Sequence, residues 1–519
     1  MRKNKEIKTL KYLSKISTIH GLSYIGDKRV SRSCRFLWIL SLVVSCSWSF
    51  FYLLKVYEKV FIAPDISVKI GYVPLKHFPF PAITICPHNK FPHTTINYKE
   101  NLLKIKRAEN VSKLIEAQIE VALQSCQLGV YDLEDVELNI SSEHLVYNLS
   151  QYQYFIDDMI PVSCFDTCSE SSRTFYSRFL TFQGFCASFN LMNFDEIFTK
   201  EMSRDFFFNR VQSELSWDLT NGYSNNESDY PYRMSNGNYK SFDAILLQDN
   251  GNVDKDCSGF RRGYEVYWHL PNEVLTHWHS SININNINKD NQIYLRTKSF
   301  KMSPELQKYN VKYRQCYFDG EKKLKFFKIY TEKNCKFECL ANFTLNKHGC
   351  VRYFMPRDKS TPLCTSKDLQ AVSFTEIDFE DNADGHQCDC YPPCNNIQYE
   401  LFSWAEINLL PDMNFGEHFD FRRIRNIDFE DELKDFDRTR TTSFSIKAVK
   451  EKVEERTSFS AYQMQQFISD FGGLLSLAMG CSILSIVELI YNAFNIKNEP
   501  EDETEEKVEE KGYLSETQL

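Results

Sequence analysis

Residues 36–54, FLWILSLVVSCSWSFFYLL, are an apolar run that decides the class of this chain. The run has 19 residues without a charge, close to the roughly 20 that a helix needs to cross the hydrocarbon core of a bilayer. A cleaved signal peptide is the alternative. Against it, the 35-residue leader is long, the run exceeds the usual apolar region of a signal, and no small-x-small site precedes Lys55. We expect a transmembrane helix over residues 36–61.

A second apolar run lies near the other end of the sequence. Residues 471–487, FGGLLSLAMGCSILSIV, are 17 uncharged residues, and the apolar character continues past Glu488 to Phe494. This run predicts a second transmembrane helix over residues 465–494 with one acid inside it. A mean hydropathy of −0.42 and 25% charged residues exclude a protein with many spans. Residues 62–464 are therefore expected to form a large domain in water.

Charge predicts the orientation of the two spans. Residues 1–35 hold ten Lys and Arg against two acids, so the positive-inside rule places this N-terminal segment in the cytosol. Two spans return the acidic tail, residues 495–519, to the same side and leave residues 62–464 outside the plasma membrane. The net charge of −9 excludes a nucleic-acid partner, because neutralising phosphates needs a surplus of Lys and Arg.

Cysteines and glycosylation motifs support this topology independently. Fourteen of the 17 cysteines fall between the spans, and an even number in an oxidising compartment indicates up to seven disulfides. Zinc binding, which the spacing Cys335-x-x-x-Cys339 would allow, requires an intracellular location, so we expect no metal. Five N-x-Ser/Thr motifs lie in the same region and none lies in either tail; they are Asn110, Asn139, Asn148, Asn226 and Asn342.

The region between the spans is predicted to form a mixed α+β domain. Hydrophobic alternation predicts strands around residues 82–86 and 182–189, and helical spacing predicts a helix over 102–123. Residues 217–256 are rich in Asn, Ser and Gly and predict a loop. Residues 316–394 carry eight cysteines in 79 residues and predict a stiff cysteine-rich module. No motif of a nucleophile, a zinc protease or a phosphate-binding loop is present, so we do not expect an enzyme.

Seven motifs occur in one order along almost the whole chain. They are Ser17-Thr-Ile-His-Gly21, Phe78-Pro-Phe-Pro-Ala-Ile-Thr-Ile-Cys86, Gly184-Phe-Cys-Ala-Ser-Phe-Asn190, Arg314-Gln-Cys316, Cys335-Lys-Phe-Glu-Cys339, Cys388-Asp-Cys390-Tyr-Pro-Pro-Cys394, and Asp470-Phe-Gly-Gly473 with Gly480-Cys-Ser-Ile-Leu-Ser-Ile-Val-Glu488. Together they resemble the degenerin/epithelial sodium channel superfamily, and the chain is most similar to its insect pickpocket branch. Where the acid-sensing branch has a Trp three residues before Cys316, this chain has Tyr313.

The resemblance implies a trimer whose hand-like extracellular domain has a palm, a finger and a thumb, the thumb being residues 316–394. It also implies disulfide pairs, and Cys126 with Cys257 is the pair that then remains. The implied pairs are Cys86 with Cys186, Cys164 with Cys168, Cys316 with Cys394, Cys335 with Cys390, Cys339 with Cys388, and Cys350 with Cys364.

Pore residues are carried over from the same resemblance. Gly480, Cys481 and Ser482 match the selectivity filter, which favours sodium; from the residues alone, a small-residue helix contact is the alternative. Asp470 lies about 15 Å before Gly480 along a helix and would form a ring of carboxylates at the outer mouth, whereas Glu488 lies about 12 Å inward. The remaining positions match a gate at the pore mouth, Ser469 with Gly473, and a gating motif, His20-Gly21.

The expected function is that of a subunit of an amiloride-sensitive, sodium-selective cation channel with a sensory role. An extracellular or mechanical stimulus would open it, and the sequence does not identify that stimulus or any extracellular ligand. Its partners would be membrane lipid and related subunits in a homo- or heterotrimer, with permeant Na⁺ and no cofactor. The alternative is a non-conducting regulatory or ligand-binding receptor subunit. ATP-gated trimeric channels share the topology but lack this filter.

Overall fold

The computed structural model describes most of the chain between residues 21 and 491. The described residues are 21–27, 29–107, 109–126, 144–152, 160, 162–165, 176–208, 215–224, 230–234, 240–248, 255–258, 261–381, 388–408, 441–449, 452–480, 482, 484, 485, 487, 488, 490 and 491. They divide into two compact units. The helical unit draws on Met1–Ser67, Ser303–Arg314 and Phe459–Leu519, and the β-rich unit on Val68–Met302 and Gln315–Ser458.

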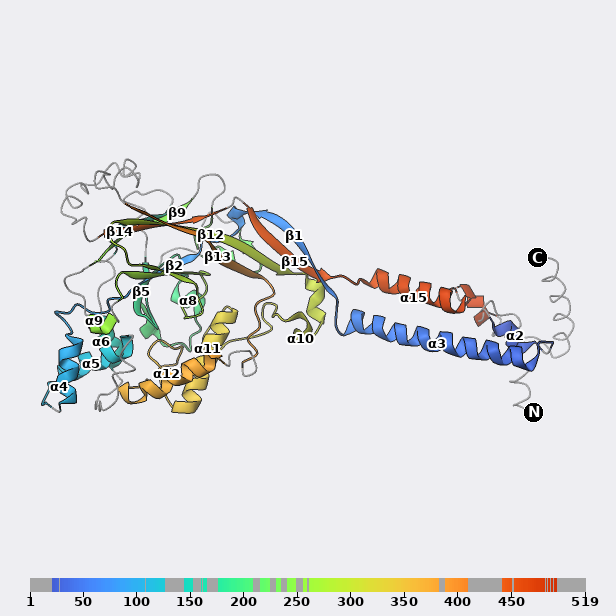
Figure 1. Cartoon of the computed structure of the whole chain (residues 1–519), viewed down its shortest axis with the longest axis horizontal. Coiled ribbons are helices and arrows are strands. Elements are labelled where there is room, and N and C mark those ends of the chain that lie inside the picture. Colours follow the sequence, from blue (N-terminus) through green and yellow to red (C-terminus); the bar gives the residue numbers. More distant parts are fainter. Residues whose placement is uncertain are drawn as a thin grey trace. The chain divides into compact units, whose positions relative to one another are not determined.

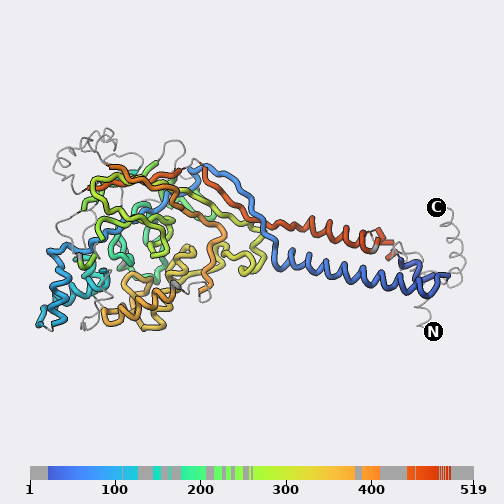
Figure 2. Tube along the Cα trace, in the orientation of Figure 1, coloured from blue at the N-terminus to red at the C-terminus, as the bar shows by residue number. Residues whose placement is uncertain are grey.

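Two long helices dominate the helical unit and run side by side (Figures 1 and 2). The first, α3 (Arg32–Phe61), begins at Ser31, whose hydroxyl accepts a hydrogen bond from the Cys34 N–H at 3.3 Å. The second, α15, spans Met464–Met479. Shorter elements complete the unit: α2 (Leu22–Gly26), the 3₁₀ helix η5 (Pro304–Lys308) and α10 (Val311–Arg314).

Of the helices that the structure describes, α3 alone is long and apolar enough to cross a bilayer. It covers the predicted span of residues 36–61 and starts four residues earlier. α15 accounts for the first half of the predicted second span, and the rest of residues 465–494 is described only in part. Of the predicted N-terminal segment, residues 1–35, the first 20 lie outside the described residues, as does the predicted tail, residues 495–519.

The β-rich unit contains a seven-stranded sheet built around β12 (Lys289–Met302). β12 pairs antiparallel with β13 along one edge, and on its other edge it pairs in parallel with β14 and then with β15. The sheet order is β1-β15-β12-β14-β9-β3, with β13 on β12. The other strands are β1 (Ile66–Pro74), β3 (Val162–Phe165), β9 (Ser241–Leu247), β13 (Asn396–Asn408), β14 (Thr441–Ala448) and β15 (Lys452–Ser460).

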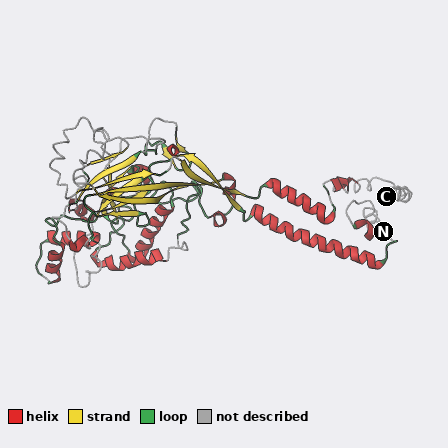
Figure 3. Ribbon diagram, turned by 45° about the horizontal axis from the view of Figure 1, so that its top comes forward, coloured by secondary structure: helices red, strands yellow, loops and turns green. Residues whose placement is uncertain are grey.

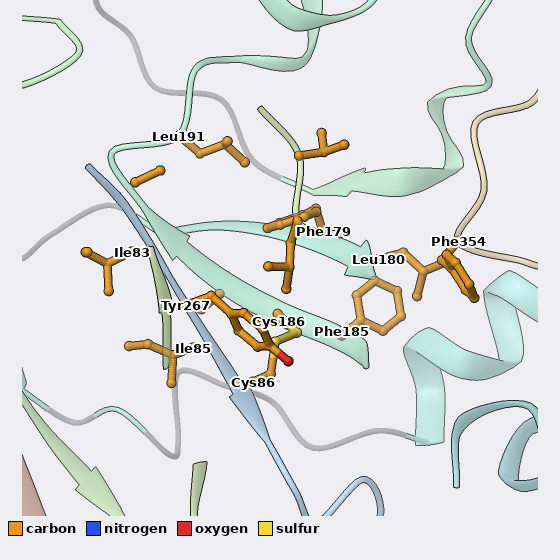
Figure 4. Close-up of a cluster of buried hydrophobic side chains, with 14 of the residues drawn as sticks. Ile83, Ile85, Cys86, Phe179, Leu180, Phe185, Cys186, Leu191, Tyr267 and Phe354 are labelled. Carbon is orange, nitrogen blue, oxygen red and sulfur yellow. A yellow bond between two sulfur atoms is a disulfide. The ribbon is translucent and has the colours of Figure 1, made fainter. Parts of the chain in front are cut away.

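A second sheet has six strands in the order β11-β10-β2-β5-β4-β6. Their bounds are β2 (Ala82–Pro87), β4 (Tyr176–Thr181), β5 (Gly184–Phe189), β6 (Phe207–Phe208), β10 (Tyr264–His269) and β11 (Ser281–Ile284). Every residue of β2 and β5 is buried, and Figure 4 shows Ile83, Ile85 and Phe179 near the Cys86–Cys186 disulfide. Such continuous burial is typical of a strand covered on both faces.

Aromatic rings join the two sheets into one core. Phe189 of β5 stacks on Phe242 of β9 with ring centroids 4.6 Å apart, and Phe242 lies 5.8 Å from Phe444 of β14. All three side chains are fully buried. A small hairpin, β7 (Trp217–Asp218) with β8 (Gly222–Tyr223), completes the strands among the described residues.

Helices border the sheets of the β-rich unit (Figure 3). In chain order they are η1 (Leu75–His77), α4 (Tyr98–Lys106), α5 (Lys113–Ser125), α6 (Leu145–Tyr152), α8 (Phe194–Ile197), η4 (Arg204–Phe206), α9 (Lys255–Ser258), α11 (Glu332–His348) and α12 (Ser366–Asp381). The cysteine-rich module, residues 316–394, is built on α11 and α12. A Thr331 cap and the left-handed Gly349 set the two ends of α11.

Six disulfides occur among the described residues. They are Cys86–Cys186, Cys126–Cys257, Cys316–Cys394, Cys335–Cys390, Cys339–Cys388 and Cys350–Cys364. Five of these bridges are pairs that the resemblance implies, and Cys126–Cys257 is the pair that remained. The pairing of Cys164 with Cys168 falls outside the described residues.

Two expectations about secondary structure were wrong. The helix predicted over 102–123 is two helices, because α4 ends at Lys106 and Ser112 starts α5 by accepting a hydrogen bond from the Ile115 N–H at 3.4 Å. The loop predicted over 217–256 contains β9, a strand between β14 and β3. Polar residues flank the apolar segment of β9, so the composition of the region predicted a loop.

Candidate functional site

The site predicted for conduction lies in the helical unit, where α3 and α15 pack against each other. The Ser45 hydroxyl of α3 donates a hydrogen bond to the Ala478 carbonyl of α15 at 2.7 Å. At the other end of the pair, the Phe61 ring meets the Phe467 ring edge-on with centroids 6.0 Å apart. A polar contact near one end and an aromatic contact near the other fix α15 along α3.

The predicted filter is a break in the helix. α15 ends at Met479, and Gly480 follows in the left-handed conformation with φ 61°, its N–H donating to the Ser476 carbonyl at 2.8 Å. Ser482 then caps the next helical residues, because its hydroxyl accepts from the Ser485 N–H at 3.2 Å. The last carbonyls of a helix lack their regular partners, and here the Gly480 N–H and the Ser45 hydroxyl bond two of them, those of Ser476 and Ala478. Backbone oxygens of this kind are ligands that hard cations prefer.

The structure orients the predicted mouth carboxylate, Asp470. Both of its oxygens accept hydrogen bonds: Oδ1 from the Gln466 amide at 2.9 Å, and Oδ2 from the Tyr462 hydroxyl. Burial and the Asp470 carboxylate raise the pKa of the Tyr462 phenol, so this hydroxyl stays protonated and keeps donating. Because α15 is continuous from Met464 to Met479, Asp470 stands on the same rigid helix that leads to Gly480.

The other predicted pore residues lie on or beyond α15. Ser469 is exposed on the helix. Gly473 is also exposed, and a Cβ built there would meet nothing within 4 Å. Glu488 is exposed in the helical residues beyond the break. Cys481 lies outside the described residues.

The gating motif is described only at its glycine, since His20 lies outside the described residues. Gly21 has φ 85°, and a Cβ there would lie 2.8 Å from Cε3 of the Trp38 ring of α3. Both observations require glycine at this position. The ring of Tyr24 in α2 stacks on the same Trp38 ring, with centroids 5.1 Å apart. The motif therefore holds α2 against α3.

The segment Ser303–Arg314 contacts the C-terminal end of α3 and the residues that lead into α15. The buried Tyr309 hydroxyl donates to the Val60 carbonyl in α3 at 2.6 Å. Glu305 Oε1 accepts from the N–H of Ser460, which leads into α15, at 3.3 Å. Tyr313, at the position where the resemblance places an aromatic coupling residue, is instead 49% exposed. Tyr309 makes the contact with α3 in this chain.

A buried amine lies in the β-rich unit beside the six-stranded sheet. Lys90 Nζ donates to the Pro87 carbonyl at 2.7 Å and to Gln183 Oε1 at 3.0 Å, and Gln183 in turn donates to Glu265 at 3.1 Å. Burial lowers the pKa of Lys90 from 10.5 to about 7, although the Glu265 carboxylate opposes the shift. Its charge therefore changes near neutral pH.

Four residues that hold the helical unit together are not among those predicted from the sequence. Gln466 precedes Asp470 by four residues, a helical spacing at which side chains meet, and Ser45 is a polar residue within an apolar run. Both signals were available in the sequence. Tyr462 and Tyr309 gave no such signal, because their partners lie across a helix start or far along the chain.

The chain is similar to pickpocket proteins and to proteins named as ion channels. Pickpocket protein 28 of Drosophila melanogaster is 23% identical over 501 residues, covering 92% of this chain and 77% of the relative. Sodium channel protein Nach of Drosophila ananassae is 22% identical over 490 residues, covering 92% and 84%. Acid-sensing ion channel 1 of Gallus gallus is 24% identical over 179 residues, covering 33% and 30%.

The family described as amiloride-sensitive sodium channel matches residues 13–492. This match covers both helices of the pair and the β-rich unit between them, including the helix break at Gly480 and the oriented carboxylate of Asp470. It confirms the resemblance that the seven motifs indicated. The chain belongs to the amiloride-sensitive sodium channel family.

Proposed function

We propose that this chain is one of three subunits of a sodium-selective, amiloride-sensitive cation channel, with residues 36–61 and 465–494 as its spans. Both termini lie in the cytosol, and residues 62–464 lie outside the plasma membrane. An extracellular or mechanical stimulus opens the channel. Permeant Na⁺ passes the filter formed by Gly480, Cys481 and Ser482 from three copies.

The helix break at Gly480 carries this proposal. An apolar helix that ends at a left-handed glycine and is followed by a capping serine leaves its regular backbone path inside a bilayer, where unsatisfied backbone groups are costly. Irregular backbone at membrane depth is tolerated where it is buried in protein or lines a water-filled cavity, and we propose the second for this break. Three such breaks around one axis would supply oxygen ligands to a dehydrated cation.

Neighbouring residues support the same path. Gly472 and Gly473 leave the surface of α15 open, so another copy of the helix can approach closely there. Asp470 raises the local concentration of cations at the mouth, and Glu488 does so on the inner side. Ser469 forms the gate, and its small side chain lets the gate close. His20-Gly21 couples the N-terminal segment to α3.

The test is whole-cell sodium current from this chain expressed alone, with Ser469 replaced by Trp. A bulky side chain at an exposed position on α15 should hold the gate open and give a constitutive current that amiloride blocks. Ser469→Ala is the matched control, because a small side chain leaves the gate free to close and should give no constitutive current.

Two further results would separate the alternatives. A constitutive current with equal permeability for Na⁺ and K⁺ would contradict sodium selection at Gly480–Ser482. Absence of current from glycosylated surface protein would contradict a homomeric pore, and would favour an obligate partner subunit or a non-conducting receptor role.

A further inference from the structure

A cavity of about 230 Å³ lies in the β-rich unit where four segments meet. Two walls come from the seven-stranded sheet, at Ser299–Lys301 of β12 and at Asn395–Ile397 where β13 begins. The third wall consists of Val73, His77 and Phe78, and the β7–β8 hairpin is the fourth. The cavity therefore touches parts of the chain that are more than 300 residues apart in sequence.

The hairpin wall is held in place without a ligand. Both Asp218 oxygens accept hydrogen bonds at 2.6 Å, one from the Thr220 N–H and one from the Asn221 amide. The Tyr223 hydroxyl donates to the Pro231 carbonyl at 2.6 Å. A site that is formed before binding loses little conformational entropy when a ligand arrives.

The lining combines apolar walls with a few polar groups. Trp217 and Phe78 are buried and Tyr223 is half-buried, and together they give the lining its aromatic surface; the Arg233 guanidinium covers one face of the Tyr223 ring at 4.2 Å. Asn395 and Asn396 add two half-buried amides at the start of β13. Aromatic walls with a small number of convergent polar groups are typical of small-molecule sites.

The charged residues of the lining indicate which small molecules the cavity would bind. Among the described residues that line the cavity, Lys301 and His77 are basic and none carries a carboxylate. Asp218 of the hairpin is engaged in its own turn. Lys301 Nζ pairs with Glu455 Oε2 at 2.8 Å, and an ammonium group has three donors, so it can bind a second acceptor from the cavity.

We propose that this cavity binds a small organic carboxylate, with the carboxylate at Lys301 and an apolar or aromatic body against Trp217 and Tyr223. Asn395 follows Cys394, which is bonded to Cys316, so a bound molecule would join the hairpin and β12 to the base of the cysteine-rich module. A chemical stimulus or modulator of this family member would bind at this site. Binding itself is independent of conduction, so it can be tested even if the pore is silent.

The experiment measures binding of phenylacetate to the purified full-length protein in detergent by isothermal titration calorimetry. Phenylacetamide, which has the same shape without the charge, is the ligand control. Lys301→Gln should weaken phenylacetate binding by about tenfold, because a charge-assisted hydrogen bond is lost. Lys298→Gln is the matched control, since Lys298 also pairs with a glutamate, Glu400, at 2.7 Å but does not line the cavity.

A second variant tests the location without touching a charge. Thr220→Trp adds a large side chain at an exposed position of the hairpin and should abolish binding, whereas Thr220→Ala should leave it unchanged. Saturable binding with this pattern supports the site. No binding, equal binding of phenylacetamide, or equal affinity in Lys301→Gln and Lys298→Gln would overturn the proposal.

Discussion

At the scale of single residues, the orientation of Asp470 makes a prediction about conduction. Tyr462→Phe and Gln466→Met each remove one donor from the Asp470 carboxylate. Either change should lower the single-channel sodium conductance by roughly half at 10 mM NaCl, where the field of a mouth carboxylate is least screened. The loss should shrink as salt rises toward 1 M.

The neighbouring Gln465 provides the matched control, because it is exposed on the same helix and Asp470 accepts from Gln466 instead. Gln465→Met should leave the conductance unchanged at every salt concentration. Since Gly480 lies ten residues further along, the ratio of sodium to potassium permeability should be unaffected in all three variants. A conductance loss that is independent of salt would argue against an electrostatic role.

The buried Lys90 predicts a pH dependence of stability. Its pKa is about 7 in the folded chain and 10.5 in the unfolded chain, so between these values only the unfolded chain binds the proton. The free energy of unfolding therefore rises with pH across this window. Relative to Lys90→Met, the wild type should gain about 1.4 kcal/mol per pH unit between pH 7 and 10.

Thermal unfolding of both proteins across this pH range measures the gain as a difference in midpoint. Lys99→Met serves as the control, because the Lys99 side chain is 66% exposed. The difference between Lys99→Met and wild type should stay constant with pH. A constant difference for Lys90→Met as well would show that the amine is not desolvated.

The sequence predicts which residues should matter for conduction, but it does not predict how the structure holds them. Asp470, Gly480 and Ser482 stand in short motifs, so their positions were predictable. The donors to Asp470 were not, because Tyr462 lies before the start of α15 and reaches the carboxylate only once the helix begins at Met464. A motif gives the types and order of residues. It does not give the hydrogen bond from Tyr462 to Asp470, because that bond depends on where the helix begins.

At the scale of elements, the segment Ser303–Arg314 predicts a local effect on α3. Tyr309→Phe removes the donor to the buried Val60 carbonyl. Losing such a bond costs about 1 kcal/mol, so amide hydrogen exchange near the end of α3, residues 58–63, should become about fivefold faster. Tyr313→Phe, at an exposed tyrosine of the same segment, should leave this exchange unchanged; a similar increase in both variants would contradict the role of Tyr309.

Secondary-structure elements were predictable where one signal dominated. β2 and β5 carry alternating hydrophobic residues next to Pro and Gly, and both occur where this alternation predicted strands. The helix predicted over 102–123 failed because periodicity continues across the cap at Ser112. β9 was missed because its burial depends on pairing with β14, about 200 residues later in the chain. The apolar segment of β9 lies between polar residues, so the local sequence did not reveal this pairing.

At the scale of the whole molecule, the paired cysteines and the glycosylation motifs predict topology together. Disulfides form in oxidising compartments, and the six described bridges all lie between the two apolar runs. Of the five glycosylation motifs, Asn110 and Asn342 are exposed in the β-rich unit and Asn148 is half-buried on α6. Asn139 and Asn226 lie outside the described residues.

Two spans with both termini in the cytosol therefore make a specific prediction for glycan number. Asn110→Gln and Asn342→Gln should each remove one glycan, read as a shift in gel mobility that enzymatic deglycosylation abolishes. Tyr513→Asn places a new glycosylation motif with Ser515 in the acidic tail, well beyond residue 494, and should add none, because the glycosylating enzyme acts only in the lumen. A glycan at position 513 would place the C-terminus outside the cell, which residues 465–494 could not allow if they cross the membrane as proposed.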